Sequence, residues 1–170
     1  MGRCRSIFPN NILQTLYYSL VYPYLIYCCI VWGGACATAL NTLQVLQNRC
    51  VRLITRSPYR SSASPLFKQL RILKLMDIRK LQIALFMFKC LNALLPDSCS
   101  QYCIINLRTY YNMRNNHDFL IPNYRTYIRE QCISVMGPKV WDSLPQSIRI
   151  AERLDLLKRL VINYFISFCI

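Results

Sequence analysis

Acidic residues and glycines are scarce in this chain. Its 170 residues include 7 Asp and Glu against 21 Lys and Arg, and only 4 Gly. Two-metal nucleotidyl transfer needs clustered carboxylates that hold ions about 4 Å apart. Here the acids are scattered and no adjacent aspartate pair occurs; they are Asp77, Asp97, Asp118, Glu130, Asp142, Glu152 and Asp155. Glycine-rich phosphate loops of the G-x-x-x-x-G-K-[ST] or G-x-G-x-x-G type are also absent. We therefore expect no nucleotide chemistry and no cofactor.

Metal ligands are scarce as well. His117 is the one histidine, and none of the 10 cysteines belongs to a C-x-x-C pair. The nearest approach is Cys99-x3-Cys103, whereas a structural zinc site needs four ligands. A Cys–His nucleophile pair using His117 is the catalytic alternative, but a single histidine in a polar loop is usually solvated. We expect no metal site, no catalysis, and free thiols without disulfides in a reducing compartment.

Positive charge is what the chain has in excess. The formal net charge is +14, and a folded domain with this charge repels itself without an anionic partner. Hydrophobic residues make up 54% and charged residues 16%, a balance that favours a packed chain over a disordered one. Phosphate groups of RNA, DNA or lipid are the expected partners.

One segment has no charge at all. Residues 6–48 contain no Asp, Glu, Lys or Arg, and the core of this run is LYYSLVYPYLIYCCIVW at residues 16–32. This core is at the short end of the roughly 17 to 25 residues that span a bilayer. Its tyrosines and Pro23 are unusual at a bilayer centre, because tyrosine prefers the headgroup level. Buried tyrosine-rich helices are the favoured interpretation, and a small membrane-anchored basic protein using residues 6–48 is the alternative.

Apolar residues recur every three to four positions in most of the chain, which predicts helices. These helices cover about residues 10–33 with a kink at Pro23, and then 38–55, 65–73, 77–93 and 151–168. Residues 106–129 are polar and irregular, so we expect a helical domain at 1–105 and a C-terminal extension at 106–170. Alternation in residues 131–136 predicts a strand, paired with residues 119–121. The predicted fold class is therefore mainly α, a helical bundle with a small β-ribbon and a C-terminal helix.

Arginines line one face of the second predicted helix. Arg49, Arg52 and Arg56 are spaced three and four apart, and Arg60 in the following loop extends this row. Lys68 and Arg71 continue the basic surface, and nearby tyrosines can stack on unpaired bases. A second basic and aromatic cluster comprises Arg108, Tyr110, Tyr111, Arg114, Tyr124, Arg125, Tyr127 and Arg129. Its alternative interpretation is a solvated loop whose tyrosines cover the core.

Several strings in series resemble one family. LYYSLVYPYLIYCCIVWGGA, LNTLQVLQNRCVRLIT and SPLFKQLRILKLMDIRKLQIALFMFKCLNALLP resemble the segment that follows the palm in jockey-like LINE reverse transcriptases, which are encoded by non-LTR retrotransposons. GPKVWDSLPQSIR, followed by a helix, is similar to the carboxy terminus of the same polyproteins. The resemblance covers residues 12–165 in the family's order.

The resemblance implies a helical thumb that holds the template-primer duplex, followed by an extension. Arg49, Arg52 and Arg56 are carried over as duplex-facing residues, and Lys68 and Arg71 follow them. The catalytic palm and the endonuclease of the family lie upstream and are missing, so we expect a fragment that is not itself an enzyme. Its expected partners are RNA, DNA and the missing palm, with no small-molecule substrate, in an intracellular ribonucleoprotein of cytoplasm or nucleus. A decayed element without a selected function is a further possibility.

Overall fold

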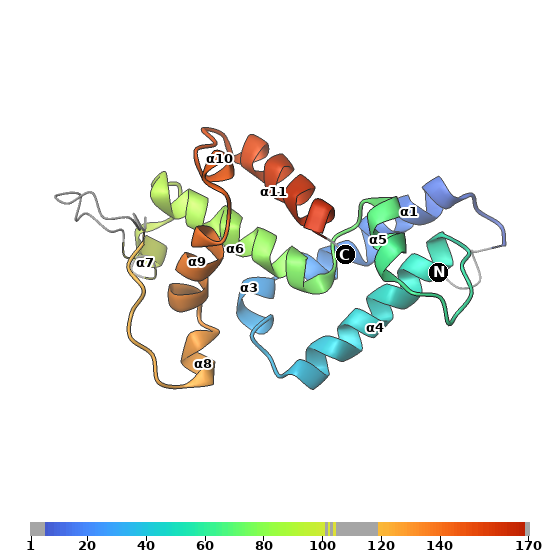
Figure 1. Ribbon diagram of the computed structural model, residues 1–170, viewed down its shortest axis with the longest axis horizontal. Coiled ribbons are helices and arrows are strands. Elements are labelled where there is room, and N and C mark those ends of the chain that lie inside the picture. Colours follow the sequence, from blue (N-terminus) through green and yellow to red (C-terminus); the bar gives the residue numbers. More distant parts are fainter. Residues whose placement is uncertain (1–5, 101, 103, 105–118, 169–170) are drawn as a thin grey trace. The chain divides into compact units, whose positions relative to one another are not determined.

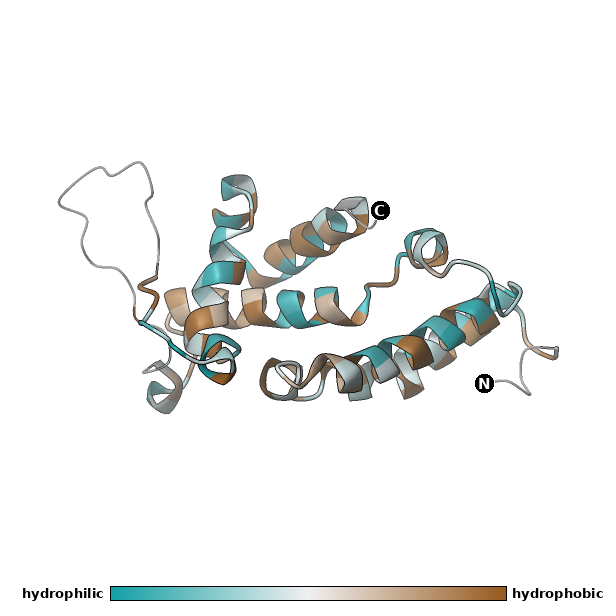
Figure 2. Cartoon of the chain, turned by 60° about the horizontal axis from the view of Figure 1, so that its bottom comes forward, coloured by the Kyte–Doolittle hydropathy of each residue, from teal (hydrophilic) through white to brown (hydrophobic). Residues whose placement is uncertain are grey.

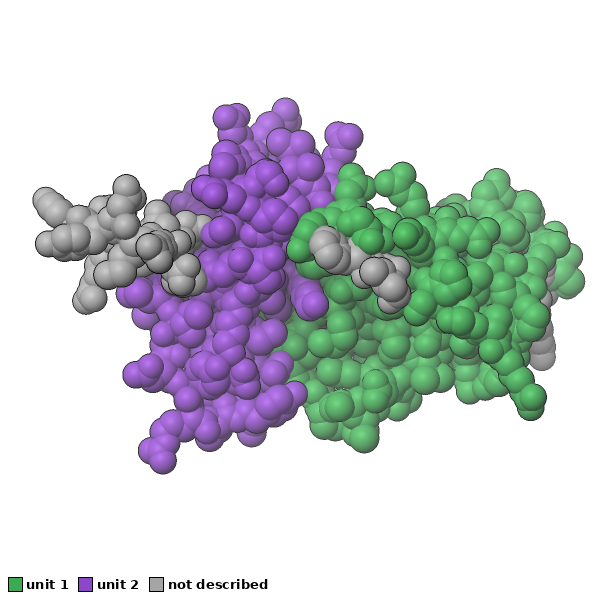
Figure 3. Space-filling model, in the orientation of Figure 1, with its two compact units in different colours: residues 1–79, 162–170 green, residues 80–161 purple. Residues whose placement is uncertain are grey.

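A computed structural model describes residues 6–100, 102, 104 and 119–168. In these residues the chain is mainly helical and contains no strand (Figure 1). Two compact units are present, and Figure 3 colours them separately. The first unit comprises residues 1–79 and 162–170, and the second comprises residues 80–161. The mainly α fold class is therefore confirmed.

The uncharged segment forms three short helices and then the first two thirds of a longer one, all in the first unit. The short helices are α1 (Asn10–Leu20), α2 (Tyr22–Ile26) and α3 (Cys29–Trp32). Proline is tolerated in the first turn of a helix but not in its interior, and Pro23 accordingly lies in the first turn of α2, after α1 has ended. Cys28, with a φ of 48°, separates α2 from α3. Within the described residues, no helix combines the length and the apolar character needed to cross a bilayer.

The first unit is built around α4 (Ala37–Ile54), which packs against α1 and against α5 (Ser64–Leu70). Fully buried side chains fill the contacts between these helices; they are Leu13, Tyr17, Val51, Ile54 and Phe67. Burying one such side chain stabilises the fold by roughly 1.5–3 kcal/mol. The apolar stripe along α4 thus holds this unit together.

A buried amide connects the helices of the first unit. The Gln47 side chain is 1% exposed, and its Nε2 atom donates to the Tyr17 hydroxyl and to the Leu73 carbonyl, each at 2.9 Å. Gln44 Nε2 donates to the Gln47 Oε1 atom at 3.1 Å, and Gln44 Oε1 accepts from the backbone N–H of Leu75 at 3.1 Å. Each polar atom of the buried amide therefore has a partner, as burial requires.

The second unit contains shorter helices around the C-terminal part of α6 (Leu75–Leu91). They are α7 (Asp97–Ser100), α8 (Tyr127–Glu130), α9 (Ile133–Asp142), α10 (Gln146–Arg149) and the start of α11 (Leu154–Phe168). Trp141 is fully buried and meets Phe119 edge to face, with the ring centroids 6.3 Å apart. These two aromatic rings are among the largest fully buried side chains of this unit.

The predicted β-ribbon is wrong. Residues 131–136 do not form a strand, because Cys132 is the N-cap of α9 and the helix runs through Gly137 and Pro138. Val135, Pro138 and Trp141 are buried three positions apart, which is helical spacing, and a six-residue window shows too little of that period to distinguish helix from strand. The proposed partner at residues 119–121 makes an isolated contact elsewhere, where Leu120 N–H donates to the Ile104 carbonyl at 2.8 Å.

The predicted domain boundary and the predicted free thiols differ in how the structure bears on them. The boundary between residues 105 and 106 lies outside the described residues and stays a prediction, while the two compact units divide the chain at other positions. Free thiols are confirmed for every cysteine in the described part of the chain: Cys28, Cys29, Cys36, Cys50, Cys90, Cys99 and Cys132.

Replacing Gln47 with Met is expected to lower the free energy of unfolding by about 2 kcal/mol, because each buried group left without a partner costs roughly 1–3 kcal/mol. A thioether cannot donate to the Tyr17 hydroxyl or to the Leu73 carbonyl. Urea unfolding followed by circular dichroism measures the effect. Gln69→Met, at an exposed position on α5, is the matched control. Equal stability of the two variants would contradict the structural role of Gln47.

Stability is also expected to fall in alkaline solution. Burial raises the pKa of Tyr17 well above its ordinary value, and it also raises the pKa of Tyr18 and Tyr22. An unfolded tyrosine titrates near pH 10, so above about pH 10 the unfolded state binds fewer protons than the folded state and is favoured. The unfolding free energy, measured in urea from about pH 8 to 11, should therefore decline at the upper end. Tyr17→Phe should flatten this decline, and an unchanged slope in that variant would refute the assignment to Tyr17.

Candidate nucleic-acid interface

Arg49 and Arg52 lie on the side of α4 that is turned away from the buried stripe. Residue 49 follows the buried Gln47 by two positions, which is more than half a helical turn, so its side chain emerges on the opposite side. Arg49 is exposed and Arg52 is half-buried. Figure 2 shows hydrophilic and hydrophobic residues along this helix. The amphipathic pattern of α4 thus presents both guanidinium groups at the surface.

A hollow of about 240 Å³ opens between these arginines and the loop that follows α4. We call it the arginine–tyrosine hollow, and its lining residues are Arg49, Arg52, Leu53, Ser57 and Tyr59. The Arg49 Nη2 atom lies 3.5 Å from the Tyr59 hydroxyl oxygen, and the Arg49 guanidinium carbon lies 6.0 Å from the ring centroid. The Tyr59 side chain is 71% exposed. A cationic group and an open aromatic face therefore meet at one place.

The loop that carries Tyr59 is held by hydrogen bonds. Arg52 Nε donates to the Ser61 carbonyl at 2.9 Å, and both the backbone N–H and the hydroxyl of Ser61 donate to the Pro58 carbonyl, at 3.1 and 2.7 Å. The Thr55 and Ser57 hydroxyl oxygens lie 2.9 Å apart. Arg52 thus orders the loop through one nitrogen. In the described part of the chain, neither Arg49 nor Arg52 forms an ion pair.

A second hollow of about 310 Å³ lies further toward the N-terminus of α4. It is lined by Asn41, Thr42, Val45, Leu46 and Arg49. Val45 and Leu46 are 47% and 49% exposed, which gives this hollow an apolar wall. Arg49 belongs to both hollows and so lies between two partly apolar depressions.

Arg56 and Arg71 lie just after the ends of helices, whereas Arg49 lies within α4. Each follows the end of a helix with a positive φ, 56° for Arg56 after α4 and 53° for Arg71 after α5. Ser57 N–H donates to the Arg52 carbonyl at 3.1 Å and Ile72 N–H donates to the Phe67 carbonyl at 2.9 Å, which are the six-to-one hydrogen bonds of a Schellman motif. Glycine usually fills this left-handed position because a side chain is strained there.

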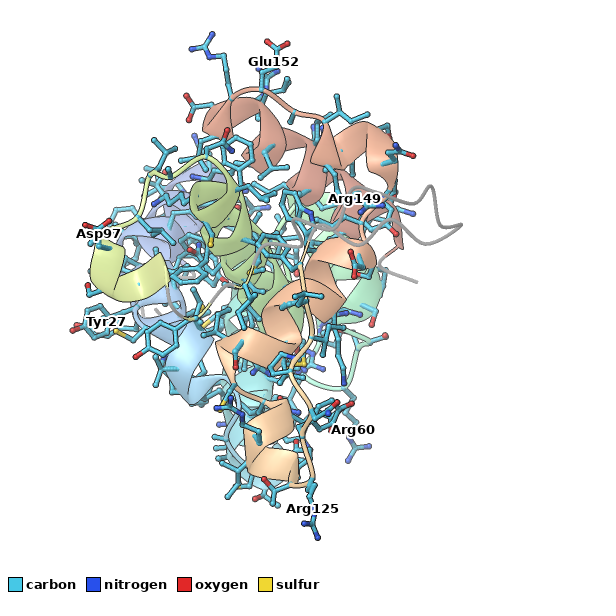
Figure 4. The ribbon with its side chains drawn as sticks, turned by 90° about the vertical axis from the view of Figure 1, so that its left-hand side faces the viewer. Tyr27, Arg60, Asp97, Arg125, Arg149 and Glu152 are labelled. Atoms are coloured by element: carbon cyan, nitrogen blue, oxygen red, sulfur yellow. The ribbon has the colours of Figure 1, made fainter. Side chains whose placement is uncertain are left out.

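The predicted row of arginines is therefore only partly present. Arg49 and Arg52 share a hollow, but α4 ends at Ile54, so Arg56 is not on the helix and donates to the Phe8 carbonyl at 3.1 Å. Arg71 donates to the Asn163 side-chain oxygen at 3.0 Å. Arg60 is exposed and points away from the ribbon (Figure 4).

The remaining predicted residue, Lys68, is exposed on α5. Leu53 and Ser57 line the arginine–tyrosine hollow but were not predicted to belong to the site. Its apolar side chain and its place in the helical period predict that Leu53 is buried, whereas the structure leaves it half-buried. The turn-rich sequence after residue 55 could have indicated these additional lining residues. A loop that folds back beside the end of a helix can place a serine and a tyrosine next to that helix.

The structure describes only part of the second predicted basic and aromatic cluster. Arg108, Tyr110, Tyr111 and Arg114 lie outside the described residues. Arg125, Tyr127 and Arg129 are exposed, and Figure 4 shows the Arg125 side chain extending from the ribbon. Tyr124 has a structural contact, because its hydroxyl accepts from Lys139 Nζ at 2.6 Å.

Lys139 also forms an ion pair with Glu130 at 2.7 Å. The hydrogen bonds to Glu130 and then to Tyr124 raise the pKa of Lys139. Lys139 therefore has an acidic partner, which Arg49 and Arg52 lack in the described residues. Over the described ranges, no group of three or more His, Cys, Asp or Glu side chains is placed to hold a metal ion.

Arg56→Gly should stabilise the protein by about 1 kcal/mol relative to Arg56→Ala, because glycine adopts a positive φ without strain. Both variants lose the same charge and the same side-chain hydrogen bonds. The difference between their unfolding free energies therefore reports the backbone strain at residue 56. The measurement is the denaturant midpoint of each variant. If alanine were as stable as glycine, the left-handed conformation assigned to residue 56 would be refuted.

Comparison with known proteins gives no match. Protein-family models, curated proteins and solved structures were compared with the chain, and none of them matches it. The function has to be inferred from the residues themselves.

Proposed function

We propose that the chain binds nucleic acid through the exposed side of α4, as a non-catalytic module that grips a template-primer duplex. The observation that supports this proposal most directly is the arginine–tyrosine hollow, which Arg49 and Arg52 line together with the exposed ring of Tyr59. Guanidinium groups bind phosphate oxygens in a planar, bidentate manner, and tyrosine offers a face to the bases.

The charge of the chain favours the same class of partner. Seven acidic residues cannot neutralise 21 basic ones, and Arg49 and Arg52 lack an acidic partner in the described residues. Phosphates that replace the missing carboxylates release condensed counterions when they bind, which supplies affinity without sequence specificity. A polyanion therefore relieves the repulsion that the isolated chain carries.

The family resemblance gives this proposal its biological setting. The strings that resemble the post-palm segment of jockey-like LINE reverse transcriptases span α1 to α6, and the helical character of this region fits a thumb-like bundle. We therefore place the chain in a retrotransposon RNA-directed DNA polymerase whose palm and endonuclease reside on other sequence. In that setting the polymerase's own palm performs the chemistry, and this module holds the duplex.

Arg49→Gln is expected to weaken binding to a primer–template duplex roughly 10- to 100-fold at about 100 mM salt, because one charged hydrogen-bonding group is lost. The slope of log affinity against log salt should become less steep by about 1, because one phosphate contact is lost. Fluorescence anisotropy over a salt series measures both quantities.

The matched control is Arg159→Gln, which removes the same charge from an exposed position on α11. It should leave affinity within about twofold, since it lies outside the proposed interface. Equal losses in the two variants would indicate that net charge alone drives binding. Binding that is indifferent to salt and to both substitutions would refute the proposed function.

A further inference from the structure

We infer that the arginine–tyrosine hollow receives an unpaired base of single-stranded nucleic acid, with the base stacked on Tyr59 and the adjoining phosphate bound by Arg49 and Arg52. This inference rests on the proposed function and specifies which part of the nucleic acid the site recognises. Bases in a duplex are stacked on one another and paired, so they cannot offer a free face to a tyrosine. A single strand, an overhang or a displaced strand can.

The hollow offers three kinds of contact to the base of one nucleotide: an aromatic ring for stacking, an apolar wall and a polar group. The Tyr59 ring is 71% exposed, and its hydroxyl lies within 3.5 Å of Arg49 Nη2, which limits how the ring can turn. Leu53 supplies an apolar wall, and the Ser57 hydroxyl supplies a polar group. Base stacking on aromatic side chains tolerates every sequence because each base has a π face.

The size of the hollow limits what can bind there. Sites for drug-sized ligands have volumes of roughly 300–1,000 Å³, and this hollow of about 240 Å³ is smaller. One ring system with part of its sugar is a unit of a size that suits it. The phosphate stays at the rim, where the exposed Arg49 side chain can reach it.

The neighbouring hollow extends the same pattern along α4. Arg49 stands between the Tyr59 side and a second depression walled by Val45 and Leu46. An apolar wall, a cation and another apolar wall in sequence match the alternation of base, phosphate and base along one strand. The geometry thus suits two consecutive nucleotides whose shared phosphate contacts Arg49.

The test compares two oligonucleotides with equal charge. One is a single-stranded 12-mer of oligothymidylate, and the other is a 12-mer in which every nucleotide is an abasic spacer. The wild-type chain should bind the base-bearing strand roughly 5- to 100-fold more tightly, the range expected for stacking of one base on an aromatic side chain. Tyr59→Ala should remove this preference, and Tyr59→Phe should keep it because the ring remains.

Tyr24→Ala is the control, because Tyr24 is a similarly exposed tyrosine, 79%, within the uncharged segment. It should leave the preference unchanged. Arg49→Gln should weaken binding of both strands, since both carry phosphates. Thermal melting of each variant monitors folding, and Tyr59→Phe preserves the ring without a large change in volume.

Three results would overturn the inference. A wild-type chain that binds both strands equally well has no base subsite, and a preference that survives in Tyr59→Ala places that subsite elsewhere. Loss of the preference in Tyr59→Phe would show that the hydroxyl, not stacking, is responsible. In each case salt-dependent binding that Arg49→Gln weakens would leave the proposed function standing, whereas no binding of either strand or of the duplex would refute both.

Discussion

The buried amide of Gln47 determines how α4 is rotated, and the rest of the candidate site depends on that rotation. Gln47 donates hydrogen bonds to the Tyr17 hydroxyl and the Leu73 carbonyl. Water cannot replace these partners, because the side chain is only 1% exposed. A turn of α4 that withdrew Gln47 would leave several buried polar groups unsatisfied, at roughly 1–3 kcal/mol each. With Gln47 held inward, the helical geometry directs Arg49 outward. The buried hydrogen bonds of Gln47 thus determine where the charge of Arg49 lies on the surface.

The helices of the chain could be predicted from apolar spacing, but their rotation could not. The predicted ranges for α4, α5, α6 and α11 agree with the structure to within a few residues, and three of these helices, α4, α6 and α11, carry several turns of a 3.6-residue period. The apolar period predicts that Leu46 lies in the core, whereas the structure leaves Leu46 49% exposed and buries Gln47 next to it. A glutamine enters the core only when partners from other segments satisfy it, and those partners are set by tertiary contacts. The misassigned strand at residues 131–136 has a different origin, since so short an apolar pattern fits both the strand period and the helix period.

The left-handed helix ends show why unusual backbone geometry does not by itself identify a functional residue. Arg56 and Arg71 adopt positive φ values, and strained residues often gather at functional sites. Ala93, however, ends α6 with a φ of 52° and the same six-to-one hydrogen bond, from Leu94 N–H to the Lys89 carbonyl at 2.8 Å. An alanine there carries no charge for a partner to recognise. With only 4 glycines in the sequence, other residues have to occupy these positions. The case for α4 therefore depends on the hollow and not on the strain.

Recognition by Arg49, Arg52 and Tyr59 would depend on features that every nucleotide shares. Arginines read the charge and geometry of phosphate, and a tyrosine face accepts any base, so neither group distinguishes one sequence from another. Arg52 adds rigidity, because the same side chain that offers charge to a phosphate also fastens the loop beside Tyr59 through the Ser61 carbonyl. A site whose cation and ring are already positioned loses little conformational entropy when a strand binds. Such a site suits a module that must hold successive nucleotides of any template while the strand moves past it.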